Sequence, residues 1–175
     1  MKVIFLDIDG VLNTDGYRRR LGTDYFSALI DPAMLPGLQR IVAETGAVIV
    51  LSSSWRKYYC PNGPQQDPAG ICIAAAMEAA GLRIFDKTPL LGYGPRGDAI
   101  AAWLRGKSVE SYVILDDNPI GRDRHLLAHF VQTDPGAGLC PAAVERAIAV
   151  LGGCLQPLPG LGKQIKTWVL SLRWR

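Results

Sequence analysis

The stretch Val3-Ile4-Phe5-Leu6-Asp7-Ile8-Asp9-Gly10 decides the fold, because an apolar strand ends there in two carboxylates two positions apart, followed by a glycine. Side chains at positions i and i+2 of a strand share a face, so we expect Asp7 and Asp9 to project together from its C-terminal end. Open α/β sheets bind their ligands at that end. Like charges held this close raise the pKa of one carboxyl group, which predicts a neighbouring cation or one protonated acid. Gly10 would let the chain turn sharply, since glycine adopts positive φ freely.

A second apolar run, Tyr112 to Leu115, also ends in carboxylates, at Asp116 and Asp117, and Pro119 is suited to begin the helix that follows. Carboxylates from two strand ends would form an oxygen-rich site for a hard cation. Mg2+ binds few carboxylates together with waters and substrate phosphate. The two acidic strand ends therefore predict a Mg2+ site for phosphoryl chemistry, with either Asp116 or Asp117 as the direct ligand.

Four motifs in this order resemble a known family. Asp-Ile-Asp-Gly at residues 7–10 is similar to the first motif of the haloacid dehalogenase (HAD) superfamily of phosphatases and phosphotransferases, and Leu-Asp-Asp-Asn at 115–118 is similar to its fourth. With Ser-Ser-Trp-Arg at 53–56 and Arg-Gly-Asp-Ala-Ile at 96–100, the set most resembles the small HAD domains associated with RNA-repair proteins. The resemblance extends from Met1 to about Val150.

The second motif of that family ends a strand with a hydroxyl group that donates a hydrogen bond to a phosphoryl oxygen. The β-branched run at residues 47–51 ends in serines. The resemblance implies this role for Ser53, or for Ser52 if the strand stops one residue earlier. Gly10 and Arg56 are the other residues that we expect to contact the substrate.

The third motif is a cation near the start of the helix that precedes the Asp116 strand. Arg96 occupies that place, where most family members have lysine. Arginine keeps its charge and can bind two oxygens as a fork, which suits the role. Lys87, beside Thr88 and Pro89, remains the alternative.

The resemblance implies a Mg2+-dependent phosphohydrolase that works through an aspartyl-phosphate. Asp7 would attack phosphorus, while Mg2+ would be held by Asp7, the Asp9 main-chain carbonyl and an acid of the fourth motif. Asp9 would protonate the leaving oxygen and then take a proton from the hydrolytic water. Ser53 and Arg96 would hold the phosphoryl group during both steps.

Composition and periodicity predict one α/β domain over residues 1–151, a three-layer α/β/α Rossmann-like HAD core with a mainly parallel sheet. The chain has 175 residues, of which 49% are hydrophobic, enough to bury roughly 70% of the unfolded surface. Helices are expected at 32–45, 67–80, 97–105, 119–127 and 141–151, and a further strand near 82–85, while residues 130–139 resemble the last strand of the family and the Gly-Leu turn that follows it. Residues 152–175 are expected to form a Pro/Gly-rich linker and a basic amphipathic tail that packs on the core.

The spacing between the motifs leaves no room for a large cap domain. Between Asp9 and Ser53 there is room for a hairpin flap, at residues 13–24, and one helix. A capless site is open, which in this family goes with bulky substrates such as phosphorylated RNA or DNA ends, although small nucleotides also fit.

The charge distribution is compatible with such a substrate. The net charge of +3 is below the strongly basic balance of dedicated nucleic-acid binders. The run Arg18-Arg19-Arg20 falls in the expected flap, with Tyr17 and Tyr25 nearby, where the side chains could contact phosphate and stack on bases or could form a solvated loop. No segment has the roughly 18 apolar residues of a membrane span or the core of a signal peptide, which predicts a cytoplasmic protein without a membrane partner.

Two other functions would use a similar acidic site. A small-molecule nucleotidase or phosphotransferase would share every catalytic residue and differ only in what fits at the mouth of the site. A non-catalytic phosphate- or metal-binding module, such as a receiver domain, usually carries adjacent acids after its first strand. The separation of Asp7 from Asp9 argues against that module.

Overall fold

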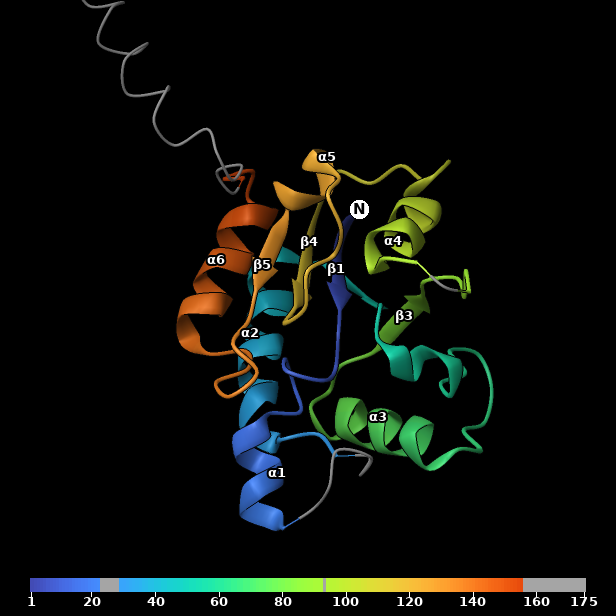
Figure 1. The fold of residues 1–175 in the computed structure, drawn as a ribbon, viewed down its shortest axis with the longest axis vertical. Helices are drawn as coiled ribbons and strands as arrows, with labels where there is room; N and C mark the ends of the chain where they lie inside the picture. The colour runs from blue at the N-terminus through green and yellow to red at the C-terminus, as the bar shows by residue number, and fades with distance from the viewer. Residues whose placement is uncertain (23–28, 93, 156–175) are drawn as a thin grey trace, which may run out of the picture.

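The computed structural model describes residues 1–22, 29–92 and 94–155. In chain order the elements are β1 (Lys2–Leu6), α1 (Asp15–Leu21), η1 (Pro32–Met34), α2 (Leu35–Thr45), β2 (Val48–Leu51), η2 (Ser54–Lys57), α3 (Pro68–Ala79), β3 (Ile84–Lys87), α4 (Arg96–Leu104), β4 (Ser111–Asp116), α5 (Arg124–Leu127), β5 (Phe130–Gln132) and α6 (Pro141–Leu151). Figure 1 shows their arrangement. The predicted amphipathic tail falls on residues 156–175 and Tyr25 on 23–28, so both lie outside the described residues.

The strands form one parallel sheet in the order β3-β2-β1-β4-β5. β1 lies at the centre, where Leu6 is in register with Leu51 on one side and Leu115 on the other. Val3 to Leu6 are fully buried, because helices cover both faces of a parallel sheet and its central strand is apolar throughout. The predicted α/β class and parallel sheet are confirmed.

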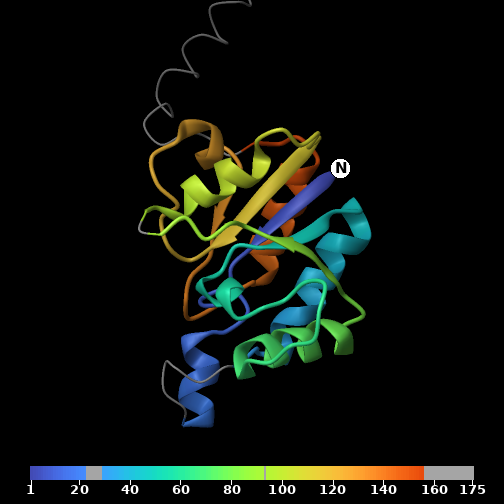
Figure 2. The same ribbon diagram turned by 90° about the vertical axis from the view of Figure 1, so that its right-hand side faces the viewer.

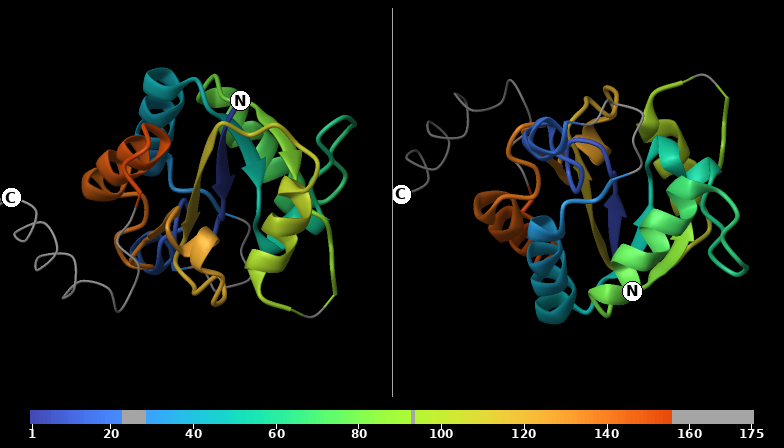
Figure 3. Two further views of the ribbon diagram at one scale, coloured as in Figure 1. Left: turned by 90° about the horizontal axis from the view of Figure 1, so that it is seen from above. Right: turned by 90° about the horizontal axis from the view of Figure 1, so that it is seen from below.

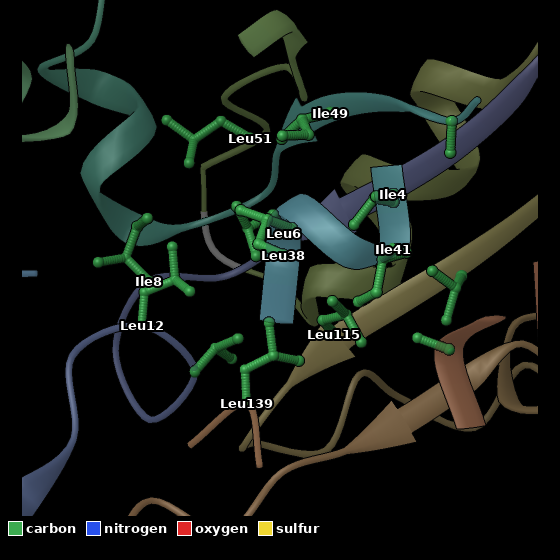
Figure 4. Packing of buried hydrophobic residues seen from close by; sticks show 14 of the residues in the cluster. Ile4, Leu6, Ile8, Leu12, Leu38, Ile41, Ile49, Leu51, Leu115 and Leu139 are labelled. Carbon is green, nitrogen blue, oxygen red and sulfur yellow. The ribbon is translucent and has the colours of Figure 1, made fainter. Parts of the chain in front are cut away.

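Two apolar clusters, one on each face of the sheet, give the three layers. Ile4 and Leu6 face α2, α3 and α6, whereas Val3 and Phe5 face α4 and α5, as the alternation of a strand requires. Figure 3 shows α2 and α6 on one side of the sheet and α4 on the other. In the first cluster Leu38 and Ile41 of α2 pack onto the sheet, as Figure 4 shows.

The segment after Asp9 is a helix rather than the expected hairpin flap. Thr14 caps α1 by accepting a hydrogen bond from the Tyr17 amide, and Gly22 ends it in the left-handed conformation, which are ordinary start and stop signals for a helix. α1 extends beyond the C-terminal ends of the strands (Figures 1 and 2). In the parts of the chain that the structure describes, the connections between strands consist of α1, the 3-10 helices η1 and η2, and the helices that cover the sheet. None of these connections forms a cap domain.

The helix expected at 119–127 is much shorter, since α5 begins only at Arg124. Asp123 caps it through the His125 amide. Residues 119–123 form a loop instead, because the Ile120 carbonyl accepts a hydrogen bond from the Gly97 amide at 2.8 Å and the Ile120 side chain is buried. Among the described helices, none has the length and apolar character needed to span a membrane.

Candidate active site

The site lies where the direction of strand order reverses. From β1 the chain adds β2 and β3 on one side, and it then returns to add β4 and β5 on the other. The C-terminal ends of β1 and β4 are therefore the switch point at which open α/β sheets bind ligands. Asp7 follows β1 and its amide donates to the Leu115 carbonyl of β4 at 2.9 Å, which places it beside Asp116.

Three carboxylates meet at this point. Asp7, Asp116 and Asp117 each offer an oxygen, and these oxygens lie within 4.8 Å of one another. Asp7 and Asp116 are only 2% and 1% exposed. Burial, reinforced by the Asp7 charge, raises the pKa of Asp116 to about 8, and burial also raises the pKa of Asp7 against the opposing effect of Arg96. Two buried carboxylates this close favour a shared proton, and a bound cation would compete with that proton.

These residues fit a hard divalent cation. All the donors are oxygens, as Mg2+ prefers. Within the described residues, Asp116 Oδ2 receives no well-directed hydrogen bond, although Arg96 Nε lies 3.0 Å away. The Asp9 side chain lies outside the carboxylate cluster, and the prediction assigns only the main-chain carbonyl of Asp9 to the metal.

Gly10 shapes the cluster through its conformation and its lack of a side chain. Its φ is +67°, and a Cβ at this position would lie 2.5 Å from both Cβ and Oδ2 of Asp117. The Gly10 carbonyl accepts a hydrogen bond from Thr133 Oγ1 at 2.8 Å. Only glycine allows the turn to pass directly beneath Asp117.

Arg96, rather than Lys87, contacts the carboxylates. Its guanidinium forms ion pairs with Asp7 and Asp116 and donates to the Ser52 carbonyl at 2.8 Å. Lys87 Nζ instead donates to the main-chain carbonyls of Arg56 and Tyr59, at 2.9 and 2.6 Å. Arg96, the first residue of α4, thus places a permanent positive charge beside the carboxylate cluster. Lys87 instead stabilises the backbone at the end of η2 and just after it.

The two candidate serines differ in their surroundings, although both are buried. The Ser53 hydroxyl accepts from the Trp55 amide at 3.2 Å and hydrogen-bonds to the Asp7 carboxyl group. The Ser52 hydroxyl has no partner among the residues that the structure describes. Ser53 is therefore the hydroxyl that lies beside Asp7.

Arg56 lies at one side of the site. Its Nη1 donates to the Ser53 carbonyl at 2.6 Å, while its Nε is buried without a hydrogen-bond partner in the described parts of the chain. Arg56 and Arg96 line a cavity of about 270 Å3 at the start of α4. Asp98 also lines this cavity, whereas the three clustered carboxylates do not.

The Asp9 carboxylate is held by residues that sequence reasoning did not assign to it. Trp55 Nε1 donates to Asp9 Oδ2 at 2.8 Å, and Oδ1 receives Asn13 Nδ2 at 3.2 Å and Arg18 Nη1 at 3.4 Å. Burial raises the pKa of Asp9, while the hydrogen bond from Trp55, the charge of Arg18 and the Asn13 amide oppose that rise. Trp55, two residues after Ser53, is visible in the sequence as a hydrogen-bond donor near the second motif. Its pairing with Asp9 could not be predicted, because the two residues are 46 positions apart in the chain.

The chain matches a known protein family. The model of the family described as "HAD domain in Swiss Army Knife RNA repair proteins" matches residues 3–144. Comparisons with curated proteins and with solved structures found no match. The matched span runs from β1 into α6 and contains every residue of the site described above.

Proposed function

This chain belongs to the HAD domains found in Swiss Army Knife RNA repair proteins, and from that premise we propose that it is a Mg2+-dependent phosphohydrolase acting through an aspartyl-phosphate. The family is of the HAD phosphohydrolase type. The observation that carries the proposal is the buried Asp7 carboxylate at the switch point, which has Asp116 and Asp117 on one side and the Arg96 guanidinium in contact.

Asp7 is the nucleophile in this proposal. Its Oδ1 accepts a hydrogen bond from the Ile8 amide at 2.7 Å, which fixes the orientation of the carboxyl group. An Asp7 oxygen forms a bond to phosphorus as the bond from phosphorus to the leaving oxygen breaks. Water then attacks the same phosphorus, which releases phosphate and regenerates Asp7.

Asp9 moves the protons in both steps. In the first step it gives a proton to the leaving oxygen, and in the second it takes one from the attacking water. Burial raises its pKa, which favours the protonated form that the first step needs.

Arg96 and Ser53 stabilise the charge that develops on the phosphoryl oxygens. Both already lie next to Asp7, so they need little rearrangement when phosphorus arrives. Asp7, Asp116 and Asp117, with the Asp9 main-chain carbonyl, would hold Mg2+, which when bound supplies positive charge to the phosphoryl oxygens.

The substrate that we propose is a phosphorylated RNA or DNA end. Three features support this: the RNA-repair context named in the family's description, the lack of a cap domain within the described residues, and cations on α1 and η2, the two helices that also carry Arg18 and Trp55 to Asp9. Arg20 lies over the Tyr17 ring at 5.1 Å in α1, and Lys57 lies over the Tyr58 ring at 4.5 Å after η2. Such pairs can contact phosphates and stack on bases.

The test is phosphate release from a panel of phosphorylated RNA and DNA ends, nucleotides and small phosphoesters, with Mg2+ or EDTA. We expect turnover that requires Mg2+ and is lost in Asp7→Asn. Glu110→Gln is the matched control, since it removes an exposed carboxylate far from the cluster. Preference for nucleotides over polynucleotide ends would favour the nucleotidase alternative, and Mg2+ binding without any turnover would contradict the phosphohydrolase.

A further inference from the structure

The Asp9 carboxyl group is held from two sides by side chains of separate segments. Trp55 from η2 contacts Oδ2, while Asn13 and Arg18, from the turn before α1 and from α1 itself, contact Oδ1. The Asp9 side chain is 13% exposed, so these contacts do not enclose it completely. An acid that must face a leaving oxygen needs this kind of restraint.

Trp55 also connects Asp9 to the nucleophile. The Ser53 hydroxyl caps η2 by accepting from the Trp55 amide, and the same hydroxyl hydrogen-bonds to Asp7. The Trp55 ring is partly buried and packs against the larger apolar cluster. One short turn therefore contacts both carboxylates of the proposed reaction, and its ring is anchored in the core.

We propose that Trp55 is a positioning residue for Asp9: its indole N–H holds the carboxyl group in the orientation from which Asp9 serves the leaving oxygen. An indole N–H can only donate, so Oδ2 stays its acceptor whether or not Asp9 carries a proton. The orientation of the carboxyl group is thereby kept through both steps. This inference rests on the proposed phosphohydrolase function.

The consequence depends on the leaving group. An alkoxide, such as the 5'-oxygen of a nucleoside, needs a proton as it departs, whereas p-nitrophenolate departs readily as an anion. Loss of a correctly placed acid should therefore harm hydrolysis of a nucleoside monophosphate far more than hydrolysis of p-nitrophenyl phosphate. The ratio kcat/KM is the right measure, because it covers the steps up to departure of the leaving group and omits the shared hydrolysis of the aspartyl-phosphate.

The experiment compares wild type with Trp55→Phe on both esters with Mg2+. We expect kcat/KM for the nucleoside monophosphate to fall by roughly 10- to 100-fold, mainly through kcat, and kcat/KM for p-nitrophenyl phosphate to change less than about threefold. In an Asp9→Asn background, Trp55→Phe should have no further effect on the monophosphate. Trp103→Phe is the matched control, because Trp103 Nε1 donates to the Asp86 carboxylate at 2.7 Å, outside the carboxylate cluster.

The outcomes separate the inference from the function on which it rests. An equal loss on both esters, or no loss on either, would overturn the positioning role while leaving the phosphohydrolase in place. A wild type that releases phosphate neither from these esters nor from phosphorylated RNA and DNA ends would overturn both. If Trp55→Phe fails to fold, 3-benzothienylalanine at position 55 keeps the ring shape and replaces the N–H by sulfur. We expect the same large loss of kcat/KM on the nucleoside monophosphate and the same small change on p-nitrophenyl phosphate. An equal loss on both esters, or no loss on either, would again overturn the positioning role.

Discussion

Arg96 is the residue whose charge opposes the rise in pKa that burial causes at Asp7 and Asp116. It contacts Asp7 and Asp116, both almost fully buried. Removing a cation from two buried carboxylates leaves charge that only protons or metal can compensate. In the proposed reaction Arg96 would therefore share with Mg2+ the task of keeping Asp7 ionised.

Arg96→Met is expected to lower kcat/KM by about 100- to 1,000-fold, because a donor aimed at the phosphoryl oxygens is lost. The same change should tighten Mg2+ binding, since one positive charge no longer repels the ion. Calorimetric titration of Mg2+ checks the second effect. Lys87→Met is the control, as Lys87 Nζ donates to two main-chain carbonyls, and a gain in Mg2+ affinity in that variant would contradict the assignment to Arg96.

Gly10→Ala is expected to destabilise the protein by more than the roughly 1 to 2 kcal/mol that a left-handed conformation costs. The added Cβ would also collide with Asp117 and displace it from the carboxylate cluster. Gly46→Ala is a matched control, because Gly46 has the same φ of +67° and open space around its Cβ position. Urea unfolding and Mg2+ titration of both variants check this, and equal results would show that the approach of Asp117 is unimportant.

At the scale of elements, α1 matters because it carries Arg18 to Asp9. Thr14→Val keeps the side-chain shape but removes the hydroxyl that accepts from the Tyr17 amide. We expect a loss of about 1 kcal/mol in stability, faster hydrogen exchange in residues 15–21, and lower kcat. Asp123→Ala removes the equivalent cap of α5 and should leave kcat unchanged. Slow exchange in α1 of the Thr14 variant would contradict the expectation.

Helix boundaries were predictable where the signals are local. Asp67 before Pro68 and Pro141 at the start of α6 place those helices within about one residue of the expected ranges. α5 was overpredicted, because the pairing of Ile120 with Gly97 holds the preceding loop open and involves residues far apart in the chain. α1 was missed although its caps are local, since its arginines show no apolar periodicity.

The whole molecule should respond to pH through the carboxylate cluster when Mg2+ is removed. The pKa of Asp116 is raised from 3.8 to about 8, so between these values the folded state holds a proton that the unfolded state has released. The stability from this group is complete below pH 3.8 and is lost as the pH rises through 8. In EDTA we expect the free energy of unfolding to fall by at most about 1.4 kcal/mol per pH unit in this window.

Chemical unfolding between pH 5 and 8 checks this dependence. Asp116→Asn and added Mg2+ should each flatten the slope, because one removes the titrating group and the other displaces its proton. A slope that persists in both would place the titrating group elsewhere.

The local sequence by itself determined that this chain is a parallel α/β protein with acids at the ends of two strands. The apolar runs that end in Asp7 and Asp116 are local patterns. They can be recognised as strands because strand formation depends on the conformational preferences of neighbouring residues. The tertiary structure alone decided the strand order, the pairing of Arg96 with the buried acids, the position of Asp117 over Gly10 and the contact of Trp55 with Asp9. Each of these joins residues that are distant in the chain, and only packing of the two faces of the sheet brings them within a few ångströms.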